Sequence, residues 1–208
     1  MTVKEARNEA LADSVIKKLA LRNMTGYYAP TKEDALRTAL SLIGEGSTVT
    51  NGGCMSAEEI GLIDAVKTGN FRYIDRDAAE DKRQAMLDAY DADVYLASCN
   101  AISKDGVLVN IDGNANRVSA IAYGPKKVIF VVGMQKVAPD VDSAIKRARN
   151  TAAPLNCTRL HCATPCVKTG SCADCLTPDT ICCQFLLTRY SRHKDRIHVI
   201  LVGEEVGY

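Results

Sequence analysis

The chain has 208 residues, 47% of them hydrophobic, and its 26 basic and 25 acidic residues give a formal charge of +1. A chain of this length can bury a sizeable core, and we expect residues 1–208 to form a single domain. Because charges of both signs are mixed along the chain, the sequence has neither the basic footprint of a nucleic-acid-binding protein nor a polybasic patch for a membrane surface.

The N-terminal segment indicates a cytoplasmic protein. Residues 1–23 are charged and amphipathic and lack the apolar core of a signal peptide, and no window of the sequence is long enough and apolar enough to span a bilayer. In a reducing compartment, nine cysteines are not a disulfide framework by default. Seven of the nine fall between Cys157 and Cys183, and this clustering points to a metal or redox site.

Helices and strands alternate through the first half of the sequence. Apolar residues recur at helical intervals over residues 3–23, and Thr31 followed by Asp34 has the spacing of a helix cap. The expected helices are 3–23, 31–46, 56–69 and 78–92, and the expected strands are 26–30, 47–50, 71–75 and 93–98. Strands that alternate with helices of this length predict an α/β fold, with a mostly parallel sheet covered by helices.

The pattern changes in the second half. "KDG", residues 104–106, lies between two short apolar runs and predicts a hairpin, whereas residues 126–133 predict a strand buried on both faces. A helix is expected over residues 138–154, started by Pro139 and ended by Pro154. The remaining expected elements are a cysteine-rich loop at 157–183 and strands within 184–190 and 196–208.

The stretch "NGGCMSAEEIG" follows the second strand and is the first candidate site. Gly52 and Gly53 permit a positive φ or a close approach to a ligand, and Ser56 with Glu59 matches a capping box at a helix start, where free N–H groups attract a carboxylate or phosphate. A plain strand-to-helix turn is the alternative. Cys54 would have a lowered pKa beside a helix N-terminus, although a small packed residue is its commonest role.

A polar stretch between residues 98 and 127 is the second candidate site. Its polar and charged side chains are Asn100, Asp105, Asn110, Asp112, Asn114, Asn116 and Arg117. They either pin an irregular hairpin or line a pocket at the carboxyl ends of the sheet, and their density favours the pocket. In a pocket, Arg117 could hold a carboxylate or phosphate, and Asp112 could act as acid or base.

The cysteine-rich loop carries the strongest signal. Cys166, Cys172, Cys175 and Cys182 follow the spacing C-x5-C-x2-C-x6-C within seventeen residues. A loop so short and so poor in large apolar residues has little to fold around except a bound ion or cluster. Four thiolates suit tetrahedral zinc, but uneven, compact spacing suits a cubane iron–sulfur cluster at least as well. A metal that only staples the loop is a further alternative. Outside this set, the loop region also contains Cys157, His161, Cys162 and Cys183.

Several long phrases resemble the LUD (lactate utilisation) domain family in its short-chain form. They are "VTNGGCMSAEEIGLID", "SCNAISKDGVLVNIDGNANRVSAIAYGPKKVIFVVG", "AIKRARNTAAPLN", "TPCVKTGSCADC" and "RIHVILVGEEVGY". The resemblance runs from about residue 10 to the end of the chain. It implies a Rossmann-like core, as in the group that contains glucosamine-phosphate isomerase, ribose-phosphate isomerase and CoA-transferases.

The resemblance also implies a function, and together with the two candidate stretches it gives the set of expected site residues. Related proteins take part in the oxidation of L-lactate to pyruvate beside iron–sulfur and oxidoreductase partner subunits. The residues expected to contact the ligand or cofactor are Asn51, Gly52, Gly53, Ser56, Asn100, Asn110, Gly113, Asn114 and Asn116, and those expected to take part in catalysis are Asp112, Arg117 and Cys54. The sequence departs from the family pattern at Cys54, usually serine, at Cys99, usually threonine, and at Ala115, usually glycine; Cys157 and Cys183 are also unusual.

Two functions follow from these patterns. The first is a cytoplasmic enzyme or redox subunit that handles a small 2-hydroxy or 2-oxo acid and carries a 4Fe-4S cluster on the four spaced cysteines. The second is a non-catalytic ligand-binding or assembly subunit with a structural zinc. Isomerase or acyl-transferase chemistry is a third, by fold analogy alone. The expected partners are a small anionic metabolite and oxidoreductase subunits, with no nucleic acid or membrane, and a homo-oligomer is left open.

Overall fold

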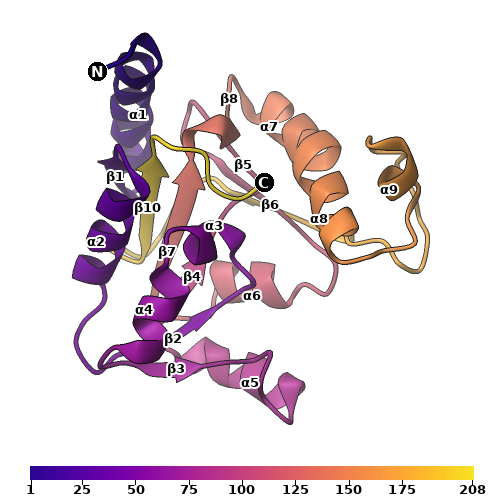
Figure 1. The fold of residues 1–208 in the computed structure, drawn as a ribbon, viewed down its shortest axis with the longest axis horizontal. Helices are drawn as coiled ribbons and strands as arrows, with labels where there is room; N and C mark the ends of the chain where they lie inside the picture. The colour runs from indigo at the N-terminus through magenta and orange to yellow at the C-terminus, as the bar shows by residue number, and fades with distance from the viewer.

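The computed structural model describes residues 1–208 and contains two sheets (Figure 1). The larger sheet has six strands in the order β1-β10-β7-β4-β2-β3, and every neighbouring pair is parallel. Its strands are β1 (Thr25–Ala29), β2 (Thr48–Asn51), β3 (Arg72–Ile74), β4 (Val94–Ala97), β7 (Lys127–Gly133) and β10 (Ile197–Val202). The predicted α/β fold with a mostly parallel, Rossmann-like sheet is therefore confirmed.

Helices cover both faces of this sheet. They are α1 (Val3–Leu21), α2 (Lys32–Leu42), α3 (Met55–Glu59), α4 (Leu62–Thr68), α5 (Lys82–Asp88) and α6 (Asn116–Ala122), with a short 3-10 turn at Ala89–Asp91. The central strand β7 serves both faces, because Phe130 packs with α1 and α6 while Ile129 and Val131 pack with α2, α3 and α4. No helix combines the length and the apolar character needed to cross a membrane.

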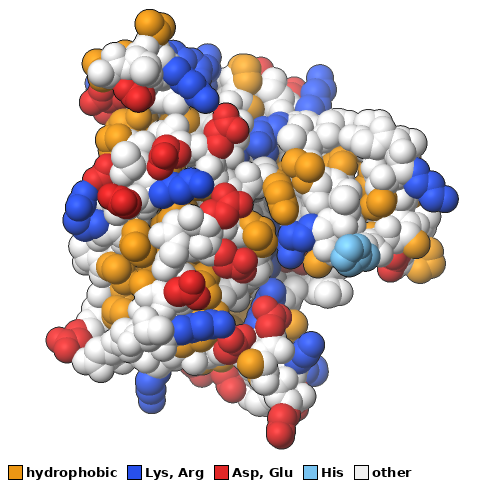
Figure 2. All heavy atoms as spheres, in the orientation of Figure 1, with side chains coloured by type: hydrophobic (Ala, Val, Ile, Leu, Met, Phe, Trp, Pro, Cys, Tyr) orange, Lys and Arg blue, Asp and Glu red, His pale blue; other side chains and the backbone are white.

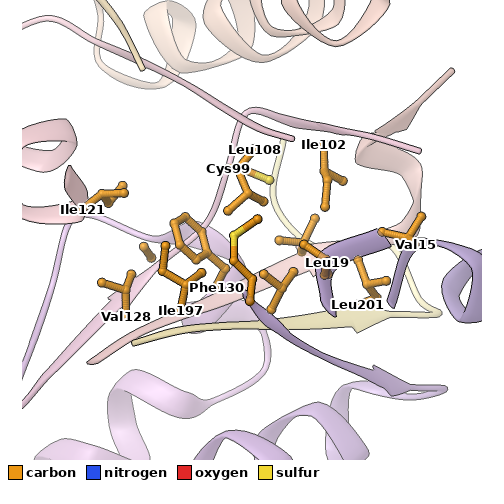
Figure 3. Packing of buried hydrophobic residues seen from close by; sticks show 14 of the residues in the cluster. Val15, Leu19, Cys99, Ile102, Leu108, Ile121, Val128, Phe130, Ile197 and Leu201 are labelled. Atoms are coloured by element: carbon orange, nitrogen blue, oxygen red, sulfur yellow. The ribbon is translucent and has the colours of Figure 1, made fainter. Parts of the chain in front are cut away.

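The smaller sheet lies against one face of the larger one. Its order is β8-β5-β6-β9, with β8 (Val137–Ala138), β5 (Ala101–Ser103), β6 (Leu108–Asp112) and β9 (Gln184–Thr188). β5 and β6 form the predicted antiparallel hairpin. Ile102 and Leu108 point from it into the core beside Phe130 and Leu19 (Figure 3). Each fully buried side chain of this size stabilises the fold by about 1.5–3 kcal/mol.

Two helices differ from the prediction at a glycine or a proline. One is divided at the glycine, and the other continues past the proline. The segment 56–69 forms two helices, since Gly61 between them adopts φ +76°. The segment ending at Pro154 does not end there: α7 (Val141–Arg147) runs through a π-helical turn (Ala148–Ala152) into α8 (Ala153–Arg159). Pro154 directly follows the π-helical turn, at the second residue of α8, and as a proline it donates no backbone hydrogen bond.

The capping box predicted at Ser56 is also wrong. Cys54 occupies the N-cap of α3 and makes no side-chain cap bond, whereas Ser56 lies inside the helix with its hydroxyl directed to other loops. The cysteine-rich loop itself contains one short helix, α9 (Pro165–Thr169), and lies at the far side of α8 (Figure 1).

Ala115 provides a test of backbone strain. It holds the left-handed conformation, φ +63°, at the start of α6, a conformation that disfavours any residue with a Cβ. Replacing Ala115 by Gly is expected to raise the free energy of unfolding by roughly 0.5–1 kcal/mol, because relief of strain outweighs the extra freedom of glycine in the unfolded chain. Urea denaturation followed by circular dichroism measures it.

The matched control is Ala10→Gly, at an exposed position in the middle of α1. That change is expected to lower the free energy of unfolding by about 1 kcal/mol. If Ala115→Gly destabilised the protein as Ala10→Gly does, the strain at position 115 would be ruled out.

Candidate functional site

A small polar cavity lies at the carboxyl edge of the six-stranded sheet. Four neighbouring parallel strands, β10, β7, β4 and β2, each send the loop that follows them to its wall. The lining residues are Gly53, Cys54, Met55, Ser56, Ser98, Cys99, Asn100, Arg117, Lys136, Asn156, Gly207 and Tyr208. We call this cavity the edge pocket. Its volume is about 30 Å³, which is room for about two water-sized groups.

The edge pocket lies where the strand order reverses. From β2 the chain passes outward to β3, and it then returns to the other side of β2 for β4, β7 and β10. The loops after β2 and β4 therefore leave in opposite directions and open a crevice between them, which is the usual ligand position in open α/β sheets. The predicted location at the carboxyl ends of the sheet agrees with this geometry.

The glycine turn shapes one wall through close approaches. A Cβ on Gly52 would lie 2.8 Å from Cγ of Arg117, so a side chain at position 52 would displace that arginine. Gly53 has φ +72°, and its N–H donates to Oδ1 of Asn51 at 2.6 Å. Glycine is thus required at both positions, at Gly52 for space and at Gly53 for conformation.

Lys136 is a buried cation with no acidic partner. It follows β7, is only 3% exposed, and donates from Nζ to Oγ of Ser56 at 3.0 Å and to Oγ of Ser98 at 3.1 Å. No carboxylate lies within ion-pair distance of it. Burial lowers the pKa of Lys136, because the charged ammonium loses its hydration.

Asp112 and Arg117 form a hydrogen-bonded support behind the pocket. The Asp112 carboxylate accepts the backbone N–H groups of Asn114, Arg117 and Val118, each at 3.1 Å. It also faces Nε of Arg117 at 3.7 Å. Nη2 of Arg117 donates to Oδ1 of Asn100 at 3.4 Å and to the carbonyl of Ile111. This network fixes Arg117 in the pocket wall, while Asp112 does not itself line the pocket.

The predicted site residues fall into three groups: those that line the edge pocket, those behind its wall and those farther along the chain at α6 and the cysteine loop. Gly53, Cys54, Ser56, Asn100 and Arg117 line it. Asn51, Gly52, Asn110 and Asp112 lie behind the wall, and Asn110 donates from Nδ2 to the carbonyl of Ser98 at 2.9 Å. Asn114 and Asn116 lie at the start of α6. Gly113 faces the cysteine loop, since a Cβ there would lie 3.2 Å from Cα of Ile181.

Sequence reasoning missed Lys136 and Ser98, which the edge pocket requires. Ser98 is the last residue of the predicted strand 93–98, and Lys136 follows the predicted strand 126–133. That position was the only signal for them. Lys136 ends the sequence "GMQK", which matches no known functional motif. Its amine lies against Ser98 because of the register in which β7 pairs with β4.

The two unusual thiols of this region are buried. Desolvation raises the pKa of Cys54 and that of Cys99 to about 11, which overturns the lowered pKa expected for Cys54 beside a helix start. Burial is the larger effect because α3 has only five residues. Cys99 packs near Leu108 in the core (Figure 3), and Cys54 packs between α3 and the sheet.

The four spaced cysteines line a second cavity of about 200 Å³, which we call the cysteine cavity. Its lining residues are Arg149, Ala153, Cys157, Thr164, Cys166, Cys172, Ala173, Asp174, Cys175, Leu176, Thr180, Cys182 and Phe185. The thiols occupy its walls and do not converge on one point, since no three Cys, His, Asp or Glu side chains form a group that could hold a single metal ion.

Hydrogen-bond donors surround these sulfur atoms. Nη2 of Arg149 donates to Sγ of Cys172 at 3.3 Å, and the N–H of Asp174 donates to the same atom at 3.4 Å. Oγ1 of Thr164 lies 3.2 Å from Sγ of Cys166. Burial, together with the neighbouring thiols of the cavity, raises the pKa of Cys182 to about 11.

Helix α8 separates the edge pocket from the cysteine cavity and lines both. Asn156 belongs to the wall of the first, whereas Ala153 and Cys157 belong to the wall of the second. Cys54 and Cys172 therefore lie in different cavities. Over the face shown in Figure 2, basic and acidic side chains alternate, so the visible surface carries no field of one sign.

Comparisons with known proteins agree with this architecture. A family model described as the LUD domain matches residues 12–202. Among solved structures, a DUF162 family protein from Deinococcus radiodurans is similar, with a TM-score of 0.56 and 14% sequence identity over 94% of this chain and 98% of that one. At that identity the likeness shows the fold alone. No curated protein matches the chain.

The thiols should differ sharply in reactivity. At about pH 8, a thiol of pKa about 11 is ionised in about one molecule in a thousand, so Cys54 and Cys99 should resist iodoacetamide in the folded protein, and their reaction should speed up as pH rises toward 11. Exposed Cys183 should react first. Peptide mass spectrometry checks the order, and alkylation of Cys54 as fast as Cys183 would contradict it.

Proposed function

The chain belongs to the LUD domain family, and from this premise we propose that it binds a small 2-hydroxy or 2-oxo acid, or a related anion, in the edge pocket. We propose further that Cys166, Cys172, Cys175 and Cys182 hold an iron–sulfur cluster of the 4Fe-4S type in the cysteine cavity. In this proposal the protein is a cytoplasmic lactate-utilisation-like redox subunit.

The observation that carries the anion-binding proposal is the uncompensated charge of Lys136. A buried cation is costly unless an anion balances it, and only hydroxyl groups lie within hydrogen-bond distance of Nζ. Arg117 contributes a second positive group to the same wall. A short carboxylate would supply the missing charge. The volume of about 30 Å³ has room for about two water-sized groups, so the carboxylate end of a small acid is the part that would enter.

The residues of the cysteine cavity support the iron–sulfur proposal by their number and type. Four thiols on the walls of one cavity match the four ligands that a cubane needs. Four thiolates also suit tetrahedral zinc, with Zn–S distances of about 2.3 Å, and the metal content of the purified protein distinguishes the two. Arg149 and the N–H of Asp174 would donate to the Cys172 thiolate and favour its ionised form.

The two sites have separable roles in this proposal. When bound, the cluster would supply one-electron transfer to a partner subunit. The chain's own residues would bind and orient the acid: Lys136 and Arg117 neutralise its carboxylate, and Asp112 holds Arg117 in place. Helix α8 provides a short structural connection, because neighbouring residues Asn156 and Cys157 face the two cavities.

Replacing Lys136 by Met tests the anion pocket. Affinity for lactate and pyruvate, measured by isothermal titration calorimetry, should fall by about 30-fold, or about 2 kcal/mol. The free energy of unfolding without ligand should rise by about 1 kcal/mol, because a buried unpaired charge is replaced by an apolar chain of similar length. A loss of binding with a gain in stability identifies a functional charge.

The control is Lys127→Met. Lys127 lies at the opposite end of β7 and donates to the carbonyl of Leu42 at 2.6 Å, away from the edge pocket. It should leave affinity for both acids unchanged. Equal affinities in wild type and Lys136→Met would refute the proposed pocket.

Replacing both Cys172 and Cys175 by Ser tests the cluster. Wild-type protein purified without oxygen should contain about four irons per chain and absorb broadly in the visible range, and the double variant should lose both signals. Cys183→Ser, which changes a thiol outside the cysteine cavity, should retain them. One zinc per chain and no visible absorption in the wild type would reject the redox function in favour of a structural metal.

A further inference from the structure

The amine of Lys136 and two serine hydroxyls form a closed cluster inside the edge pocket. Nζ donates to Ser56 at 3.0 Å and to Ser98 at 3.1 Å, and the two hydroxyls lie 3.2 Å apart. The cluster joins three segments that are separate in the chain: helix α3 after β2, the loop after β4 and the 3-10 turn Met134–Lys136 after β7. Neutral hydroxyl groups orient this amine, and no ion pair holds it.

The surroundings of Nζ make its ammonium easier to deprotonate, so the charged form that binds an acid can give the neutral amine that attacks a carbonyl carbon. Burial lowers the pKa of Lys136, and the nearby guanidinium of Arg147 acts in the same direction. The thiols of Cys54 and Cys99 and the carboxylate of Glu59 act in the opposite direction more weakly than burial. A desolvated lysine with a depressed pKa is the form that attacks carbonyl carbon.

The backbone of Gly207 passes close beside the amine. Gly207, with φ +60°, passes so close that a Cβ there would lie 2.9 Å from Nζ. Glycine at this position therefore keeps a side chain away from the nitrogen. Lys136, Ser56 and Ser98 all belong to the wall of the edge pocket.

We propose that Lys136 is the nucleophile of the edge pocket and forms a reversible imine with the keto carbon of a short 2-oxo acid, an inference that rests on the proposed acid-binding function. The amine nitrogen bonds to the keto carbon, and a proton passes from nitrogen to the former keto oxygen, which gives a carbinolamine. The second proton of the nitrogen then passes to this hydroxyl, which leaves as water as the C=N bond forms. The step needs no oxidant or reductant.

The two hydroxyls would carry the protons of this step. Ser98 contacts Nζ directly, and Ser56 contacts both Nζ and Ser98. A proton released by the attacking amine can pass through Ser98 to the oxygen that leaves as water. Ser98 is the more accessible of the two, since Ser56 is completely buried. Arg117 would hold the carboxylate of the acid while the keto carbon faces Nζ.

Hydride trapping tests the imine. The full chain is incubated with pyruvate and sodium cyanoborohydride, which reduces an imine to a stable secondary amine, and the adduct is located by peptide mass spectrometry. We expect Lys136 to be modified at least about tenfold faster than any other lysine. Lys136→Arg, which keeps the charge, should lose the adduct, and Lys127→Arg should retain it. Ser98→Ala should slow trapping by about tenfold.

Parallel calorimetry with lactate and pyruvate separates the two proposals. Lactate has no keto group, so its binding tests the acid pocket alone. Binding of both acids with no adduct on Lys136 overturns the imine and leaves the acid pocket standing. Absence of binding and of adduct overturns both. Adducts distributed over surface lysines at similar rates also overturn the imine, and because the wild-type chain gives this result, it does not depend on the folding of a variant.

Discussion

The parallel alignment of the six-stranded sheet is the constraint on which the site depends. Because all neighbouring strands run the same way, the loops after β2, β4, β7 and β10 meet at one edge. Residues far apart in the chain, from Gly53 to Gly207, thereby line a single pocket. Successive side chains of β7 point to opposite faces of the sheet and pack in two separate cores, one on each side. This packing keeps the edge of the sheet rigid.

This rigidity allows the fold to keep Lys136 in an unfavourable place. Burial of an ammonium without a counter-ion opposes folding, and the hydrogen bonds to Ser56 and Ser98 offset only part of that cost. The surrounding core is large enough to tolerate the loss. A charge retained at such a cost is typical of a site shaped by function, where stability and activity favour different residues.

The sequence predicted the elements well where local signals are strong. The alternation of strands and helices, the "KDG" hairpin and the glycine turn at Gly52 and Gly53 all depend on neighbouring residues. Ser56 shows where such reasoning ends: its spacing to Glu59 matched a cap, yet tertiary contacts direct its hydroxyl to Ser98 and Lys136. Lys136 has no local signal at all, since its role arises from strand register.

Helix α8 and the π-helical turn before it supply wall residues to both cavities. A π turn adds one residue to a helical turn and so rotates the side chains beyond it. Here it carries Arg149 to the sulfur of Cys172, and α8 directly follows it with Asn156 in the edge pocket and Cys157 in the cysteine cavity. Pro154 favours this arrangement, because a regular α-helix through its position would leave a backbone carbonyl without a donor. Helix α8 thus belongs to the walls of both cavities.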